Sequence, residues 1–179
     1  MFPARLFTGG LVAIALAGCG SSPQRPEPLR PASLPKPSRP SVLMISPADY
    51  VATASAIDLY VIKASELALQ RSSALRVREA AERLIAAHKG SSAQLSFGGR
   101  RLNLLPSAEL QPRHRALLEQ LYASASFDRD YARQMEAVHQ EAALLHSGYA
   151  ASGTSPTLIP IAKALAPVME QQRRLISYL

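Results

Sequence analysis

Apolar residues in the C-terminal half of the chain recur every three or four positions, and this period constrains the fold more than any other feature. The stripe consists of Phe127, Tyr131, Met135, Val138, Ala142, Leu145 and Tyr149. Residues at this spacing share one face of an α-helix. Ser126 precedes the stripe as a helix cap, Asp128 and Asp130 suit the positive end of the helix dipole, and Gly153 is a stop signal. The pattern predicts a helix over 127–152 that buries one face.

Three further long segments carry the same helical period, and Ser, Gly and Pro residues separate them. The first covers 47–71, the second covers 74–95, and the last covers 156–179. The Gly98-Gly99 pair is expected to stop the second helix. A shorter pattern over 113–123 predicts an extra helix in the connection between the second and third long helices.

These lengths and connections predict an all-α fold, an antiparallel four-helix bundle with a short extra helix after its second member. The chain is rich in Ala and Leu, lacks Trp, and has few segments that alternate apolar and polar residues. This composition favours the same fold class. Pro167 lies within the last predicted helix, where the missing backbone hydrogen bond is expected to introduce a kink.

The net charge of +7 is spread along the chain and does not indicate a nucleic-acid partner. Residues 20–43 contribute +3, and residues 44–179 carry 15 Lys and Arg against 12 Asp and Glu, which is again +3. No basic stripe is interleaved with aromatic residues, as a nucleic-acid interface would require. A basic cluster around the extra helix could bind anions, although a solvated loop is the simpler interpretation. Its members are Arg100, Arg101, Arg113, His114 and Arg115.

Residues 1–18 have the pattern of a secretory signal peptide, with Arg5 before an apolar run that is too short to span a membrane. The segment Leu16-Ala17-Gly18-Cys19 resembles the lipobox of bacterial lipoproteins. This resemblance implies cleavage before Cys19 and acylation of that residue, so that several acyl chains such as palmitate anchor the protein in a membrane. Cys19 is the only cysteine in the sequence, and an intramolecular disulfide is therefore excluded.

Residues 19–46 are predicted to form a disordered tether between the lipidated cysteine and a bundle domain at 47–179. Closely spaced prolines block helices and sheet ladders and favour extended chain; they are Pro23, Pro26, Pro28, Pro31, Pro35, Pro37 and Pro40. The residue after Cys19 is Gly20, which by analogy with lipoproteins favours an outer-membrane protein that faces the periplasm. Besides the membrane itself, an envelope protein or the cell wall is the expected partner.

The folded part resembles the bacterial exported family catalogued as domain of unknown function 4142, which is a ferritin-like four-helix bundle. The resemblance rests on short segments in order and at the family's spacing, and it covers nearly all of the chain after Tyr50. These segments are Ser65-Glu66-Leu67-Ala68-Leu69-Gln70, Arg83-Leu84-Ile85-Ala86-Ala87-His88, Phe127-Asp128-Arg129-Asp130-Tyr131 with His139 eight residues later, and Pro156 with Pro167.

Two departures from the family pattern lie on predicted inner faces. Members of the family often have a glutamate where this chain has Val61, and a histidine where it has Gln172. If the family's inward glutamate and three histidines form a polar or metal-binding core, this protein retains only His88 and His139 of that set.

The spacing of the histidines permits a small metal site but not a complete di-metal centre. Glu136 and His139 form a Glu-x-x-His pair on one helical face, whereas Ile85 stands three residues before His88, so the second pair is missing. A single metal ion held by His88, His139 and one carboxylate, Glu136 or Asp58, is the remaining metal hypothesis.

The simpler interpretation of His88 is a buried neutral imidazole, because its position falls near the centre of the apolar stripe. Such a ring needs a hydrogen-bond partner, and Gln172 and Tyr131 are the expected candidates. His139 lies on the border of its own stripe. Polar core positions are therefore predicted at Gln172, Tyr131 and Asp58.

No hydrolase triad, phosphate-binding loop or metalloprotease motif occurs in the sequence. The sequence therefore predicts a membrane-anchored periplasmic lipoprotein with an interaction or envelope-maintenance role, and catalysis is not evident. The alternative is a ferritin-like metal-binding or redox protein with a reduced site around His88 and His139. No cofactor is firmly implied beyond that single metal ion.

Overall fold

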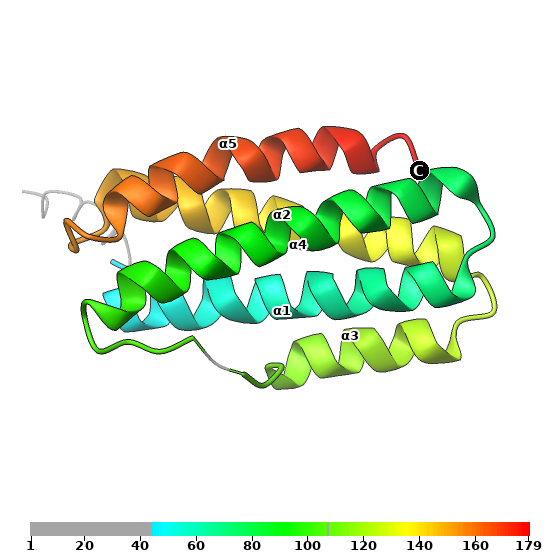
Figure 1. Cartoon of the computed structure of the whole chain (residues 1–179), viewed down its shortest axis with the longest axis horizontal. Coiled ribbons are helices and arrows are strands. Elements are labelled where there is room, and N and C mark those ends of the chain that lie inside the picture. Colours follow the sequence, from blue (N-terminus) through cyan, green and yellow to red (C-terminus); the bar gives the residue numbers. More distant parts are fainter. Residues whose placement is uncertain (1–43, 107) are drawn as a thin grey trace, which may run out of the picture. The chain divides into compact units, whose positions relative to one another are not determined.

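Each apolar stripe forms the buried side of a helix in the computed structural model of the chain (Figure 1). The structure describes residues 44–106 and 108–179, so the predicted signal peptide, Cys19 and almost all of the predicted tether lie outside the described residues. Five helices occur in the described part. Their bounds are α1 Pro47–Arg71, α2 Leu75–Arg100, α3 Pro112–Ala123, α4 Phe127–Ser152 and α5 Ile159–Ile176.

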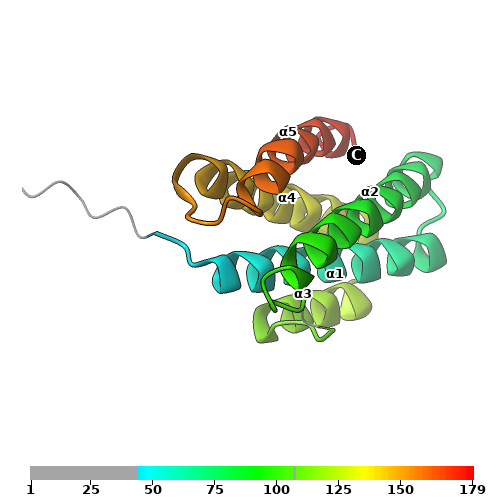
Figure 2. The same ribbon diagram turned by 60° about the vertical axis from the view of Figure 1, so that its left-hand side comes forward.

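The four long helices form an antiparallel bundle, which confirms the predicted all-α class. Successive helices run in opposite directions, with α1 packed on α2 and α4 packed on α5 (Figures 1 and 2). Contacts of α1 with α4 and of α2 with α5 complete the bundle, and the α2–α5 seam is the sparsest of the four. The short helix α3 lies outside the bundle, mainly against α1.

The start of α1 matches its sequence signals. The Ser46 hydroxyl accepts a hydrogen bond from the backbone N–H of Asp49 at 3.1 Å, and Pro47 occupies the first turn. This arrangement satisfies one backbone donor that the helix itself cannot pair.

The Gly98-Gly99 pair does not stop α2, and this prediction was wrong. The helix continues through both residues to Arg100. A Cβ atom at position 98 would lie 2.5 Å from Ile161 Cδ1, and one at position 99 would lie 2.2 Å from the Leu104 carbonyl oxygen. The two glycines therefore permit close approach of α5 and of the following turn, and they act as spacers rather than as a helix terminator.

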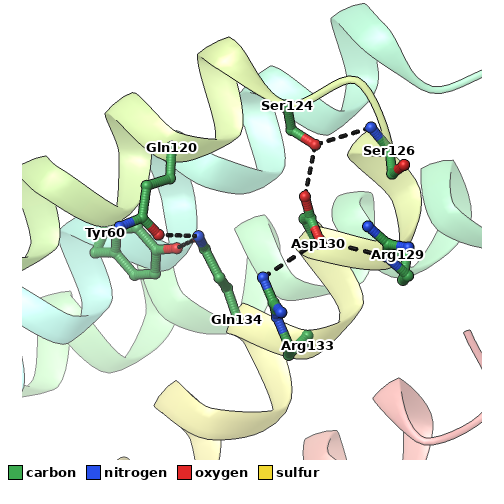
Figure 3. A network of polar contacts seen from close by, with 8 residues as sticks. All are labelled: Tyr60, Gln120, Ser124, Ser126, Arg129, Asp130, Arg133 and Gln134. Atoms are coloured by element: carbon green, nitrogen blue, oxygen red, sulfur yellow. Dashed lines mark hydrogen bonds and ion pairs between the residues drawn. The ribbon is translucent and has the colours of Figure 1, made fainter.

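The α3–α4 turn is held by a serine other than the predicted cap. Ser126 precedes α4, but its side chain makes no capping hydrogen bond. Instead, the Ser124 hydroxyl accepts from the Ser126 N–H at 3.0 Å and donates to Asp130 Oδ2 at 2.7 Å (Figure 3). The hydrogen bond from the Ser124 hydroxyl lowers the pKa of the Asp130 carboxyl, with smaller contributions from Arg129 and Arg133. The turn is thereby fixed to the first turn of α4.

The last helix begins later than predicted and passes through its internal proline. Residues 156–158 form a turn, and α5 starts at Ile159. The helix continues without interruption through Pro167 to Ile176. None of the helices in the described part combines the length and the apolar character that a bilayer-spanning segment needs.

The core contains more polar side chains than the stripes predict. Four tyrosines are almost completely buried: Tyr50, Tyr60, Tyr131 and Tyr149. All four histidines of the chain are buried as well: His88, His114, His139 and His146. Because buried imidazoles need hydrogen-bond partners, polar groups are expected around each of these histidines.

Candidate functional site

Two buried histidines face each other across the bundle. His88 on α2 and His139 on α4 have no solvent exposure, and their Nε2 atoms lie 3.1 Å apart. The rings are almost perpendicular, with an angle of 86° between their planes. The sequence correctly placed His88 in the core, whereas His139 lies deeper than the predicted border position. The reason is that α1 and α3 also pack against α4 and bury a broader face than one stripe covers.

The other ring nitrogen of His88 contacts a carboxylate. Asp58 on α1 is 1% exposed, and its Oδ1 lies 2.7 Å from His88 Nδ1. Its Oδ2 accepts a hydrogen bond from the Ser92 hydroxyl at 3.1 Å. Both carboxylate oxygens are therefore paired inside the protein, as a buried charge requires.

Asp58 thus takes the place of the partners that the sequence predicted for His88. The Tyr131 hydroxyl is paired with the Ser65 hydroxyl at 2.8 Å. Asp58 lies in the core because α1 is covered by α2, α3 and α4.

The second ring is held by the backbone of its own helix. His139 Nδ1 lies 2.7 Å from the carbonyl oxygen of Met135, one turn earlier in α4. A carbonyl can only accept a hydrogen bond, so this contact assigns the proton of the neutral His139 ring to Nδ1. The Nε2 atom of His139 therefore presents a lone pair towards His88.

The network from Asp58 to Met135 needs one proton more than its neutral histidines carry. The Asp58 carboxylate and the Met135 carbonyl each accept a hydrogen bond from an Nδ1–H group. Both Nε2 atoms of the neutral rings are then acceptors, and two lone pairs would face each other at 3.1 Å. Such a contact is stable only with a proton or another cation between the nitrogens.

His139 is the ring that stays neutral. Burial and then the charge of His88 lower the pKa of His139 to about 3, against smaller opposing effects of Met135 and Gln172. A neutral imidazole with a free lone pair is the form that binds metal ions. The network can therefore place either a shared proton or a metal ion between His88 and His139.

Gln172 on α5 lies beside this pair. Its carboxamide is close enough to raise the pKa of His139, yet its Oε1 atom is buried and makes no hydrogen bond of good geometry. The residue is 8% exposed, which agrees with the predicted inner position.

Glu136 does not join the histidines. Its Oε1 atom forms an ion pair with Arg173 Nε at 3.1 Å, and the side chains of both partners are partly exposed. Across residues 44–106 and 108–179, no three His, Cys, Asp or Glu side chains gather in a group that could hold one ion. A donor in addition to the two imidazoles would have to come from another residue type.

A second polar pair, which the sequence reasoning missed, extends the network. His146 on α4 has its Nδ1 atom 2.9 Å from the Tyr50 hydroxyl, and Tyr50 stacks on Tyr149 with ring centroids 4.0 Å apart. Burial, partly opposed by the charge of Asp58, lowers the pKa of His146 to about 4. The available signal was spacing, since His146 follows His139 by two helical turns and shares its face.

The remaining histidine belongs to a separate cluster at α3. His114 is fully buried and stacks on Tyr60, with ring centroids 5.2 Å apart and nearly parallel planes. Its Nε2 atom lies 3.1 Å from an Arg113 nitrogen. The interpretation of this stretch as a solvated loop was therefore wrong for His114. Burial and then the Arg113 charge lower the pKa of His114 to about 4.

Amides complete this cluster at α3. The Tyr60 hydroxyl donates to Gln134 Oε1, and Gln134 Nε2 lies 3.4 Å from Gln120 Oε1 (Figure 3). The Glu141 carboxylate pairs with Arg113 and partly opposes the lowering of the His114 pKa. The Nδ1 atom of His114 has no hydrogen-bond partner.

Comparisons with known proteins support the fold and the family. The model of a family described as "Domain of unknown function (DUF4142)" matches residues 32–179. The solved structure of CopM in the Cu(II)-bound form is 15% identical in sequence and has a TM-score of 0.65. The match covers 76% of this chain and 96% of the CopM chain. CopM in the Cu(I)-bound form is also 15% identical, with a TM-score of 0.63 and coverages of 74% and 94%. At this identity the likeness concerns the fold alone. No curated protein matches the sequence.

Proposed function

The chain belongs to the DUF4142 family, and we propose that its helical bundle binds one copper ion between His88 and His139. One observation carries the proposal: the two Nε2 atoms lie 3.1 Å apart in the core while both Nδ1 atoms are engaged by acceptors. This arrangement leaves two lone pairs directed at each other. A metal ion satisfies both of them without displacing any other hydrogen bond of the network.

The separation of the two nitrogens suits a shared ion. Bonds between imidazole nitrogen and a transition metal are about 2.0 Å long, so two nitrogens on one ion lie no more than about 4 Å apart. The measured distance of 3.1 Å is within that limit. The outer contacts also fit, because imidazoles that bind metals usually donate their second N–H group to a carboxylate or a backbone carbonyl. Asp58 and Met135 supply these acceptors.

Copper is the favoured ion for two reasons. Imidazole nitrogens suit copper, which also binds more tightly than the other divalent ions of its row. In addition, CopM, whose structures contain Cu(II) and Cu(I), shares this bundle fold. A bound copper ion supplies one-electron chemistry, and sequestration or transfer of the ion would use the same two ligands. The residues of this chain hold the ion, orient the rings and exclude water.

The Asp58–His88 pair would also keep the net charge of the buried site low. In the metal-free protein, a proton shared by the two Nε2 atoms would satisfy both lone pairs. An ion held by the same atoms would replace that proton, and the negative charge of Asp58 would partly compensate its positive charge inside the core.

We place this activity at the cell envelope. The lipobox Leu16-Ala17-Gly18-Cys19 supports a signal peptide and acylation of Cys19, and the following sequence supports an outer-membrane lipoprotein that faces the periplasm. Replacement of Cys19 by Ala is expected to release the protein from membranes. Continued acyl labelling and membrane retention of that variant would contradict the anchor. The interaction or envelope-maintenance role stays a prediction.

Copper binding is tested by titration of the purified protein with Cu(II), and with Cu(I) under reducing conditions, followed by metal analysis. The wild-type chain should bind one ion, and His139→Gln should lose at least about a hundredfold in affinity, because one of two nitrogen ligands is gone. His114→Gln is the matched control, since His114 is equally buried but lies outside the pair. Absence of copper binding, or an equal loss in both variants, would overturn the proposal.

A further inference from the structure

A surface groove runs along the sparsely packed seam between α2 and α5. It has a volume of 290 Å³. Arg83, Leu84 and Ala87 line it from α2, and Val168, Gln172 and Leu175 line it from α5. Leu84 is completely buried, so the groove reaches the core of the bundle. The three other seams between adjacent long helices, α1–α2, α1–α4 and α4–α5, are denser, which makes the α2–α5 seam the weakest barrier between solvent and the histidine pair.

Gln172 belongs both to the groove and to the histidine site. Its side chain lines the groove, and the same carboxamide interacts with His139. The residue is 8% exposed, and its buried Oε1 atom has no hydrogen-bond partner. A buried carbonyl oxygen without a partner destabilises the folded protein, and each such atom calls for an explanation. Here it stands beside His139, whose Nε2 atom faces the Nε2 atom of His88 at 3.1 Å.

We infer that the α2–α5 groove is the entrance to the metal site and that Gln172 Oε1 is the third ligand of the ion. The inference rests on the proposed copper binding. Three neutral acceptors, His88 Nε2, His139 Nε2 and Gln172 Oε1, lie together in the core, and one cation satisfies all of them. An ion that arrives through the groove meets Gln172 before it meets the histidines.

A carboxamide oxygen also affects which oxidation state is bound more tightly. Oxygen donors are hard ligands and favour Cu(II), whereas thioether sulfur favours Cu(I). Gln172 is therefore expected to make the site more selective for Cu(II) than two imidazoles alone would be. Its replacement by Met should reverse this preference without changing the two nitrogen ligands.

Equilibrium binding of Gln172 variants of the full chain tests the ligand assignment. Gln172→Leu should bind Cu(II) at least about tenfold more weakly, while its metal-free melting temperature stays equal or rises, because an unpaired buried acceptor is removed. Gln172→Met should weaken Cu(II) and strengthen Cu(I) binding. Gln171→Leu is the control, since Gln171 is exposed in the same groove and should bind copper like the wild type.

These outcomes separate the inference from the proposed function. If the wild type binds copper and His139→Gln does not, but Gln172→Leu binds normally, the ligand assignment alone is overturned. A lowered metal-free melting temperature with unchanged copper affinity would show that Gln172 is only structural. If the wild type binds no copper, the proposed function fails as well.

The entrance is tested by blocking the groove. In a Cys19→Ser background, Ala87→Cys is labelled with a bulky maleimide, and Ala137→Cys is labelled in the same way as a control in a different groove, between α1 and α4. The label at position 87 should slow both copper uptake and its extraction by a chelator at least about tenfold, with little change in equilibrium affinity. Equal rates for the two labelled proteins would overturn the entrance.

Discussion

The bundle contains two buried histidine clusters in which the imidazole rings have different neighbours. His88 and His139 lie between α2 and α4 with Asp58 behind them, whereas His114 on α3 stacks on Tyr60. Burial lowers the pKa of both His139 and His114, to about 3 and about 4, so each ring is neutral at physiological pH. Burial alone therefore does not distinguish a metal ligand from a packed aromatic ring.

The difference lies in what the Nε2 atom faces. His139 Nε2 meets the Nε2 atom of His88, which is also an acceptor when that ring is neutral. His114 Nε2 meets Arg113, whose guanidinium always donates and always carries a positive charge. A cation is attracted to the first lone pair and excluded from the second. The group that faces the Nε2 lone pair, an acceptor for His139 and a cationic donor for His114, therefore decides whether a buried histidine can bind a cation.

The largest expected effect comes from removing the charge partner at the first cluster. His88→Leu should destabilise the protein by about 3–5 kcal/mol, because the buried Asp58 carboxylate loses its partner. His114→Leu should cost only about 1 kcal/mol, since no buried charge is left behind. Urea unfolding of the metal-free variants measures both free energies.

The double variant Asp58→Leu/His88→Leu is the control for that experiment. Removal of both partners of a buried pair is far less harmful than removal of one, so this variant should recover most of the lost stability. Equal costs for His88→Leu and His114→Leu would contradict the contrast between the clusters.

Acid should act on the second cluster through His114. Its pKa in the folded state, about 4, is below the ordinary value of 6.5, so the unfolded chain binds more protons between these two values. The stabilisation is complete above about pH 6.5 and is lost as the pH falls towards 4, with a total of about 3 kcal/mol.

Unfolding experiments between pH 7 and pH 4 test this linkage. His146 and His139, whose pKa values are about 4 and about 3, should produce similar losses. The His114→Leu variant should therefore lose about 3 kcal/mol less than the wild type over the same range. Parallel pH profiles for the two proteins would show that His114 does not titrate in this way.

Copper binding at the first cluster should release one proton per ion, because the ion takes the place of the proton between the two rings. Competition between the proton and the ion should then make the apparent copper affinity rise with pH. Calorimetric titration in buffers of different ionisation enthalpy counts the protons. His114→Gln should leave the count unchanged, and a count of zero in the wild type would refute the proton network.

The smallest effect concerns the serine that supports Asp58. Ser92→Ala removes the hydrogen bond to Asp58 Oδ2 and should cost about 1–2 kcal/mol. The neighbouring Ser91→Ala is a matched control, because the buried Ser91 hydroxyl has no partner and its removal should be neutral or stabilising. Thermal unfolding of the two variants compares them directly. An equal destabilisation would mean that the Ser92 contact contributes nothing specific.

Much of the fold followed from local pattern. The three- and four-residue spacing of apolar side chains predicted all five helices and the antiparallel bundle, and Ser46-Pro47 marked the start of α1 correctly. These features depend on interactions within a few residues, so the order of residues is enough to reveal them. The Gly98-Gly99 prediction failed because a glycine pair can serve either a helix end or a close helix contact, and only the position of Ile161 distinguishes the two.

The site depended on contacts between helices that are distant in sequence. Periodicity placed His88 in the core and His139 on the border of its stripe, and the family resemblance linked the two histidines. Neither could select Asp58 over Tyr131 as the partner of His88. Periodicity also placed Glu136 one turn from His139, where spacing permits a shared ion, whereas Arg173 on α5 draws that carboxylate into an ion pair. The helical repeat predicts which face of a helix is buried. Hydrogen bonds and charges between helices then decide which residues on that face pair with each other.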